Sequence, residues 1–187
     1  MQGQPMEPSE ALRLLNSGPV VLASCRDGER VGIITLAWTM PVSGDPPMVA
    51  IAVSPRRFSH DLIRRSGEFA VNVPAADMID AVWVCGTVSG RDADKFETAG
   101  LAPLPAREVG APLVDGCIGH LECRVEQAVT AGDHTVFVGR VVAAGAEPGC
   151  LGDRGDRPER LQTLHHLGGR RFFTSAGALV EAGGRGR

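Results

Sequence analysis

A short polar run, Ser54-Pro-Arg-Arg-Phe-Ser-His60, gathers two hydroxyls, two guanidinium groups and an imidazole. It follows the strand-like Pro47-Met-Val-Ala-Ile-Ala-Val53 and precedes the helix-like Asp61-Leu-Ile-Arg-Arg-Ser66. The N–H groups at a helix start carry partial positive charge, and arginine forks bind oxyanions through paired hydrogen bonds. The run therefore predicts a phosphate site, although Ser59 followed by Asp61 is equally the pattern of an ordinary helix start.

Three further segments carry side chains or glycines suited to a ligand site. They are Ile33-Ile-Thr-Leu-Ala-Trp38, Cys85-Gly-Thr-Val-Ser-Gly-Arg-Asp-Ala-Asp-Lys-Phe96 and Gly132-Asp-His-Thr-Val-Phe-Val-Gly139. With these four motifs in this order, the chain resembles the flavin reductase-like family of FMN-binding split barrels, and most closely its flavoredoxin-like branch. The resemblance covers residues 19–145 and has a fainter continuation at 167–173.

The resemblance implies two groups of cofactor contacts in the first half of the chain. Backbone groups of Thr35, Leu36, Ala37 and Trp38 would lie along the flavin ring, whose edge alternates donors and acceptors as an extended chain does. The Thr35 hydroxyl could add a further bond, and Trp38 could instead be a core or interface aromatic. Ser54, Arg57 and Ser59 would contact the ribityl chain and phosphate. Because neighbours in an extended segment point opposite ways, Arg57 is preferred over Arg56, and His60 is expected at the surface.

The resemblance implies a second cofactor-facing element at Ser89, Gly90 and Lys95. A lysine near the flavin would stabilise the negative charge that appears on reduction, and glycine permits close approach. The alternative is that this is an ordinary solvated charge run. His134, predicted at a hairpin tip, would orient NADH or NADPH or stabilise the reduced flavin, because imidazole titrates near neutral pH. His165 and His166 have no metal spacing, and would line the same mouth only if the glycines that follow fold back.

The elements that must position these residues are mostly strands. Residues 20–25 and 30–35 flank Asp27-Gly28, a turn sequence of tight hairpins. The Pro/Gly-rich segment 42–47 is predicted as a loop, so three strands are expected before the first internal helix. Two long alternating segments, 117–130 and 135–147, are predicted to form a second hairpin.

A few short helices complete the prediction. One is expected to begin at Ser9 and end at Gly18, another is capped by Asp77, and a third begins at Asp92. Because strands do not alternate one-for-one with helices, an antiparallel barrel is favoured over a parallel Rossmann sheet. The resemblance specifies a mainly β fold, the FMN-binding split β-barrel with Greek-key connections and short peripheral α-helices.

Composition restricts the functional class. The 187 residues fit one domain, with a core at about 19–147, an exposed loop at 148–160 and a disordered tail at 182–187. With 19 Lys and Arg against 22 Asp and Glu, no attraction to nucleic acid is expected. No membrane span or signal peptide is visible, which favours the cytoplasm. Five cysteines without a C-x-x-C pair predict reduced thiols and no metal site.

Together these observations predict an NAD(P)H-dependent, FMN-binding flavin reductase-type oxidoreductase. A hydride would pass from NADH or NADPH to the flavin N5, and then electrons to a small molecule, a free flavin or a protein partner. By resemblance the protein would be a homodimer. Two alternatives stay open. The first is a flavoredoxin-like carrier reduced by a protein partner, since no G-x-G-x-x-G fingerprint is present. The second is a non-catalytic flavin-binding module.

Overall fold

The main element of the fold is one large antiparallel sheet. The computed structural model describes residues 7, 11–15, 18–147 and 162–175. Seven strands form the sheet in the order β2-β1-β5-β8-β9-β4-β3, with every neighbouring pair antiparallel. The strands are β1 (Val21–Asp27), β2 (Arg30–Leu36), β3 (Thr39–Gly44), β4 (Pro47–Val53), β5 (Glu68–Val73), β8 (Gly119–Ala131) and β9 (His134–Ala146).

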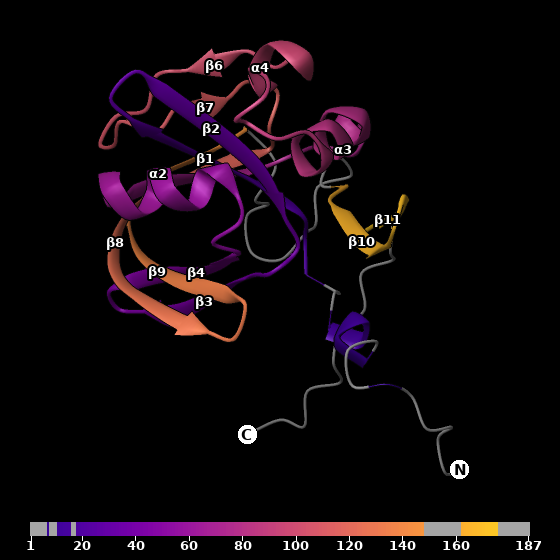
Figure 1. The fold of residues 1–187 in the computed structure, drawn as a ribbon, viewed down its shortest axis with the longest axis horizontal. Helices are drawn as coiled ribbons and strands as arrows, with labels where there is room; N and C mark the ends of the chain where they lie inside the picture. The colour runs from indigo at the N-terminus through magenta and orange to yellow at the C-terminus, as the bar shows by residue number, and fades with distance from the viewer. Residues whose placement is uncertain (1–6, 8–10, 16–17, 148–161, 176–187) are drawn as a thin grey trace, which may run out of the picture.

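The two edge strands show how the sheet closes. β2 and β3 lie at opposite edges in the strand order, yet only Ala37 and Trp38 separate them along the chain. Two residues span less than about 8 Å, so the sheet must curl until its edges meet. The Ala52 amide donates to the Trp38 carbonyl at 3.0 Å across this corner. The predicted mainly β, split-barrel fold is confirmed, and the curled sheet is visible in Figure 1.

Two loop and strand predictions had different outcomes. The hairpin at Asp27-Gly28 is confirmed, with Gly28 at φ 61°, and the long β8–β9 hairpin turns at Gly132, also at φ 61°. The loop predicted at 42–47 shrinks to a turn at Asp45 and Pro46, because β3 extends to Gly44 and pairs with β4. Four strands therefore precede the first internal helix. β3 is an edge strand, where a proline's missing N–H is tolerated.

The helices are short and lie on the outside of the sheet. They are α2 (Phe58–Ser66), α3 (Ile79–Thr87) and α4 (Lys95–Thr98), with 3-10 turns η1 (Leu12–Leu15) and η2 (Ala76–Met78). Asp94, rather than Asp92, caps α4 by accepting from the amides of Phe96 and Glu97. The predicted cap Ser9, the loop 148–160 and the tail 182–187 lie outside the described residues.

Two hydrophobic clusters lie on the two sides of β1 and β2. The first fills the barrel beneath α2 and contains Phe69 and Phe137. The second lies under α3 and α4 and contains Val82 and Phe96. β1 contributes to both clusters, which explains why its first five residues are all buried. No helix among the described residues is long and apolar enough to cross a membrane.

A separate hairpin of β10 (Leu164–Gly168) and β11 (Arg171–Thr174) lies beside α3 (Figure 1). It is tied to the barrel by the Val20 amide, which donates to the Leu164 carbonyl at 2.7 Å. Two further strands of two residues each, β6 (Pro103–Leu104) and β7 (Leu113–Val114), pair with each other. The β10–β11 hairpin thus brings residues from late in the chain to the corner where the barrel is split.

Candidate functional site

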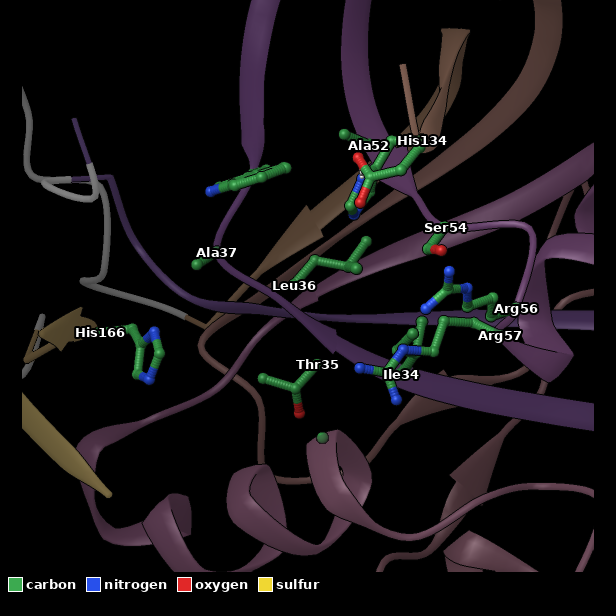
Figure 2. Close-up of a pocket in the computed structure, with 13 residues that line it drawn as sticks. Ile34, Thr35, Leu36, Ala37, Ala52, Ser54, Arg56, Arg57, His134 and His166 are labelled. Atoms are coloured by element: carbon green, nitrogen blue, oxygen red, sulfur yellow. Dashed lines mark hydrogen bonds and ion pairs between the residues drawn. The ribbon is translucent and has the colours of Figure 1, made fainter. Parts of the chain in front are cut away.

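A cavity of about 640 Å³ opens at the split of the barrel. Its walls come from β2 and the corner after it, the end of β4, the turn before α2, the tip of β8–β9, the end of α3, and β10. Seven residues predicted from the sequence line it: Thr35, Leu36, Ala37, Trp38, Ser54, Arg57 and His134. Figure 2 shows the arginines at one end, His166 at the other, and the β2 corner between them.

The arginine end has the features of an anion site. Arg57 is the N-cap residue of α2 and makes no side-chain cap bond, so the amides of the first turn are not satisfied by a capping side chain. Ser54 and Arg57 line the cavity at the same place. An uncapped helix start together with a guanidinium group favours a bound phosphate.

Arg56 also lines the cavity, which corrects the expectation that only one arginine would reach it. That expectation assumed an extended segment. Residues 55–57 instead form a turn, closed by the Arg57 amide donating to the Ser54 carbonyl at 2.9 Å. In a turn, successive side chains are not forced to opposite faces. The end of the cavity therefore holds two guanidinium groups.

The long wall of the cavity is the backbone from Ile34 to Trp38. The Thr35 hydroxyl, expected to be available for a ligand, donates to the Val82 carbonyl of α3 at 2.6 Å. Gly86 of α3 also lines the cavity, and a Cβ placed there would lie 3.4 Å from the Thr35 Cβ. The Thr35 side chain thus holds α3 against the wall, while the backbone of this segment faces the cavity.

His134 is held by two neighbours at the hairpin tip. Its Nδ1 lies 2.7 Å from Oδ1 of Asp133, and its ring centroid lies 4.8 Å from that of Trp38. The hydrogen bond with His134 is the main cause that lowers the pKa of Asp133, and Arg56 contributes. A carboxylate can only accept, so Nδ1 of His134 donates and the ring presents Nε2 to its other surroundings.

Four residues predicted for the site do not line the cavity. Ser59 is buried, with its hydroxyl 3.1 Å from where a Cβ on Gly32 would lie. The Ser89 hydroxyl accepts from the Arg91 amide, and Gly90 packs so closely on Phe58 that a Cβ there would lie 2.6 Å from its ring. The fourth, Lys95, is buried beneath the cavity.

Lys95 supports the end of α3 rather than the cavity surface. Its Nζ donates to the Cys85 carbonyl at 2.7 Å, in the last turn of the helix, where carbonyls lack intrahelical partners. Burial lowers the pKa of Lys95; the nearby Cys85 thiol opposes that shift and Arg57 adds to it. The ammonium group therefore lies close to Arg57, and below the end of α3 that reaches the cavity.

His60 differs from the expectation of a surface residue. It is buried, its Nε2 lies 2.9 Å from the Thr135 hydroxyl, and its ring packs on Phe137. Because Thr135 follows His134 on β9, this contact connects the start of α2 to the hairpin tip. The arginine end and the histidine of the cavity are thus joined by one buried hydrogen bond.

Sequence reasoning missed four other residues of the cavity wall, Ile34, Ala52, Gly86 and Asp133, and gave His166 only on the condition that the glycines after it fold back. Asp133 was part of a quoted motif and could have been found as the partner of His134. The glycines after His166 do fold back, with Gly169 at φ 58°, so His166 reaches the mouth while His165 stays buried. Gly86 carries no local signal, since only helix packing brings it to the wall.

The described cysteines are structural. Cys25, Cys85, Cys117 and Cys123 are free and buried. Burial raises the pKa of Cys85 to about 11 and of the other three to about 12. Such thiols stay protonated near neutral pH and are poor nucleophiles. No group of three metal-ligating side chains occurs among the described residues.

Comparison with known proteins identifies the family. The profile of the "Flavin reductase like domain" matches residues 12–165. The chain belongs to the flavin reductase-like family. It is 38% identical over 185 residues to protein YddH of Escherichia coli K12, covering 96% of this chain and 97% of that one. It is also 31% identical over 144 residues to an NADH-dependent flavin reductase of a Rhodococcus species, covering 73% and 74%.

Solved structures of this family share the fold. An FMN-binding protein from Thermus thermophilus, solved with bound p-hydroxybenzaldehyde, is 27% identical at a TM-score of 0.81, covering 97% of this chain and 98% of that one. The flavoredoxin of Methanosarcina acetivorans is 23% identical at a TM-score of 0.82, covering 99% and 97%. The predicted resemblance to FMN-binding split barrels is confirmed.

The residues present fit FMN. The cavity has a two-arginine end at an uncapped helix start for the phosphate, and residues 34–38 of β2 and the corner after it line the part that would hold the ring edge. Its volume is in the ordinary range for cofactor sites. Trp38 and His134 both line the cavity, with their ring centroids 4.8 Å apart.

Proposed function

We propose that the protein is an FMN-dependent oxidoreductase that uses NADH or NADPH to reduce a second molecule. One observation carries this proposal. The arginine end, which is suited to an anion, and the wall formed by residues 34–38 belong to one open cavity. When bound, FMN supplies the redox chemistry, by accepting a hydride at N5 and passing electrons on. The chain itself needs to hold and orient the reactants.

Each wall of the cavity has a separate task in this proposal. Arg57 and Arg56, with Ser54 and the first amides of α2, bind the phosphate. Backbone groups of residues 35–38 would pair with the ring edge. His134, fixed by Asp133 and Trp38, orients the nicotinamide or places a proton near it through Nε2.

The nature of the electron donor and of the acceptor rests on relatives. The Rhodococcus relative is named an NADH-dependent flavin reductase, which supports a nicotinamide donor for this chain. The Thermus relative was solved with p-hydroxybenzaldehyde, which supports a small ring compound as a ligand of the family cavity. Free flavin and a protein partner are the other acceptors consistent with the family name.

The deciding experiment is a visible spectrum of purified protein after FMN addition and desalting, followed by anaerobic NADH and then NADPH. We expect retained flavin that bleaches within seconds with one of the two donors. A protein that retains no flavin would refute FMN as a bound cofactor. The Arg57→Ala protein, treated in parallel, should retain less flavin, which ties the colour to the proposed phosphate end.

A flavoredoxin-like carrier is the second candidate, favoured by the absence of a G-x-G-x-x-G sequence. A carrier would keep its flavin and bleach slowly with either nicotinamide but promptly with a reduced protein partner. A non-catalytic module would keep flavin that neither donor reduces. The same anaerobic titration therefore separates all three functions.

We also propose a cytoplasmic homodimer. Four free buried thiols fit a reducing compartment. A groove of about 650 Å³ next to the main cavity carries exposed apolar side chains of Leu12, Leu15 and Met40, which a second copy could cover. Light scattering on the eluting protein should give twice the mass of 19.6 kDa. A monomer mass at micromolar concentration would contradict the proposal.

A further inference from the structure

A smaller cavity of about 300 Å³ lies directly beside the main one, between α3, β2 and the β10–β11 hairpin. We call it the annex. It shares Thr35, Ala37, Gly86 and His166 with the main cavity. Its other lining residues are Val20, Trp83, Thr87, Gly169 and Phe172. A molecule in the annex would therefore be in reach of whatever occupies the main cavity at the Thr35 end.

The walls of the annex are aromatic. Trp83 comes from α3, with the Arg170 guanidinium carbon 5.1 Å above its ring centre. Phe172 comes from β11, and its ring lies 5.0 Å from that of His166, its partner across the hairpin. Rings packed at such distances favour a further ring, stacked or edge-on, over an aliphatic chain.

Few side chains that line the annex could bind a charged ligand. Apart from His166, its lining side chains are uncharged, and both hydroxyls are already used. Thr35 donates to the Val82 carbonyl at 2.6 Å, and Thr87 donates to the Trp83 carbonyl at 2.8 Å. His166 Nε2 lies 3.0 Å from the Gly169 carbonyl, so it donates there, and in the neutral ring Nδ1 is left as an acceptor.

We propose that the annex binds the electron acceptor, and that this acceptor is an uncharged compound of one or two rings, such as a quinone, whose hydroquinone product can donate a hydroxyl hydrogen bond to Nδ1 of His166. The inference rests on the proposed function, because it needs a bound flavin as the neighbour. The volume of about 300 Å³ suits one or two rings and is small for a dinucleotide. The shared wall at Thr35 and Gly86 places the acceptor beside the flavin site.

The overall reaction balances without any redox group from the chain. NAD(P)H, one solvent proton and a quinone give NAD(P)⁺ and a hydroquinone. The hydride supplies two electrons and one hydrogen, and the solvent proton supplies the second hydrogen. The two carbonyl oxygens of the quinone become the two hydroxyls of the product. The buried thiols take no part.

The chain offers a direct way to locate the ligand, because it contains two tryptophans and one lies in each cavity. FMN-loaded protein labelled with 5-fluorotryptophan should give two fluorine resonances, assigned with Trp38→Phe and Trp83→Phe. Menadione added without a nicotinamide is the probe. We expect the Trp83 resonance to shift saturably and the Trp38 resonance to stay in place.

Two neighbouring phenylalanines provide a matched comparison. Phe172→Ala removes a wall of the annex and should weaken menadione binding at least about tenfold. Phe173→Ala removes the next residue of β11, which stacks on His165 outside the annex, and should leave binding unchanged. Because Phe172 also packs on the second core cluster, Thr87→Phe is the second variant. It should fill the annex from an exposed helix position and block the probe.

The outcomes separate the two proposals. A wild-type protein that keeps FMN but shows movement of the Trp38 resonance alone would refute the annex as the acceptor site. Equal losses of menadione binding in Phe172→Ala and Phe173→Ala would also refute it. Loss of FMN from Thr87→Phe and Phe172→Ala would assign the annex to the flavin itself. A wild-type protein that retains no FMN would refute the proposed function, and the acceptor site with it.

Discussion

Arg56 and Arg57 illustrate how adjacent residues of one type acquire different roles. Both line the anion end, but Asp133 lies near Arg56, which contributes to lowering the pKa of that carboxyl. Arg57 stands at the start of α2, near the buried Lys95. Arg57 therefore contributes more free positive charge to a bound phosphate than Arg56 does.

We expect Arg57→Ala to weaken FMN binding by about 10- to 150-fold. This range corresponds to the loss of about 1.5–3 kcal/mol from hydrogen bonds to a charged group. Arg56→Ala should have a smaller effect, because Asp133 offsets its charge. Quenching of FMN fluorescence by the apo-protein measures both dissociation constants. Arg64→Ala, at an exposed position in the last turn of α2, is the control. Equal effects at positions 56 and 57 would contradict this assignment.

At the scale of elements, β9 must pass very close to β5. A Cβ placed on Gly139 would lie 2.6 Å from two ring atoms of Phe69 and 3.0 Å from the Cβ of Cys123. Phe69 is fully buried in the barrel core, so its ring has no free space to enter. The strand that carries His134 at its first residue therefore depends on a glycine five positions later.

Gly139→Ala should lower the free energy of unfolding by about 1–3 kcal/mol, the usual cost of overpacking a core. Gly145→Ala is a matched control on the same strand, because a Cβ there meets nothing within 4 Å. Urea unfolding of both variants beside wild type checks the prediction. If the two substitutions had the same effect, the close approach to Phe69 would not be the cause.

The elements also show which features a sequence can reveal. The hairpins at Gly28 and Gly132 were predictable, because their turn chemistry is local and both glycines adopt positive φ. β3 was missed because proline-rich segments usually mark loops, and only its pairing with β4 makes it a strand. Gly86 and His166 enter the cavity through helix and hairpin packing, which no short pattern encodes. Seven predicted residues do line the cavity, because they lie at or near the ends of β2, β4 and β9, within the sequence motifs quoted above.

For the molecule as a whole, the buried thiols make the free energy of unfolding pH-dependent in the alkaline range. Burial raises the pKa of Cys25, Cys117 and Cys123 from 9.0 to about 12 and that of Cys85 to about 11. Above pH 9 the unfolded chain releases these protons while the folded chain keeps them. The unfolded state then binds fewer protons, so the free energy of unfolding falls as pH rises.

We expect unfolding free energy, measured in urea, to fall between pH 8.5 and pH 10.5. Each thiol contributes at most about 1.4 kcal/mol per pH unit. Lys95 acts in the opposite direction below pH 10.5, because its pKa is lowered in the folded state, but it is one group against four. Cys123→Ala should reduce the fall in unfolding free energy with pH by the contribution of one thiol. Constant stability across this range would show that the thiols ionise in the folded protein.

The cavity wall is assembled from distant parts of the chain, from Ile34 to His166. During synthesis the ribosome delivers the arginine end and the β2 corner first, then the β8–β9 tip, and the β10–β11 hairpin last. The Val20–Leu164 hydrogen bond that docks this hairpin can form only after nearly the whole described chain has emerged. A bound flavin therefore meets a complete cavity only after residue 164 has emerged, and stalled nascent chains ending before residue 164 should carry no flavin colour.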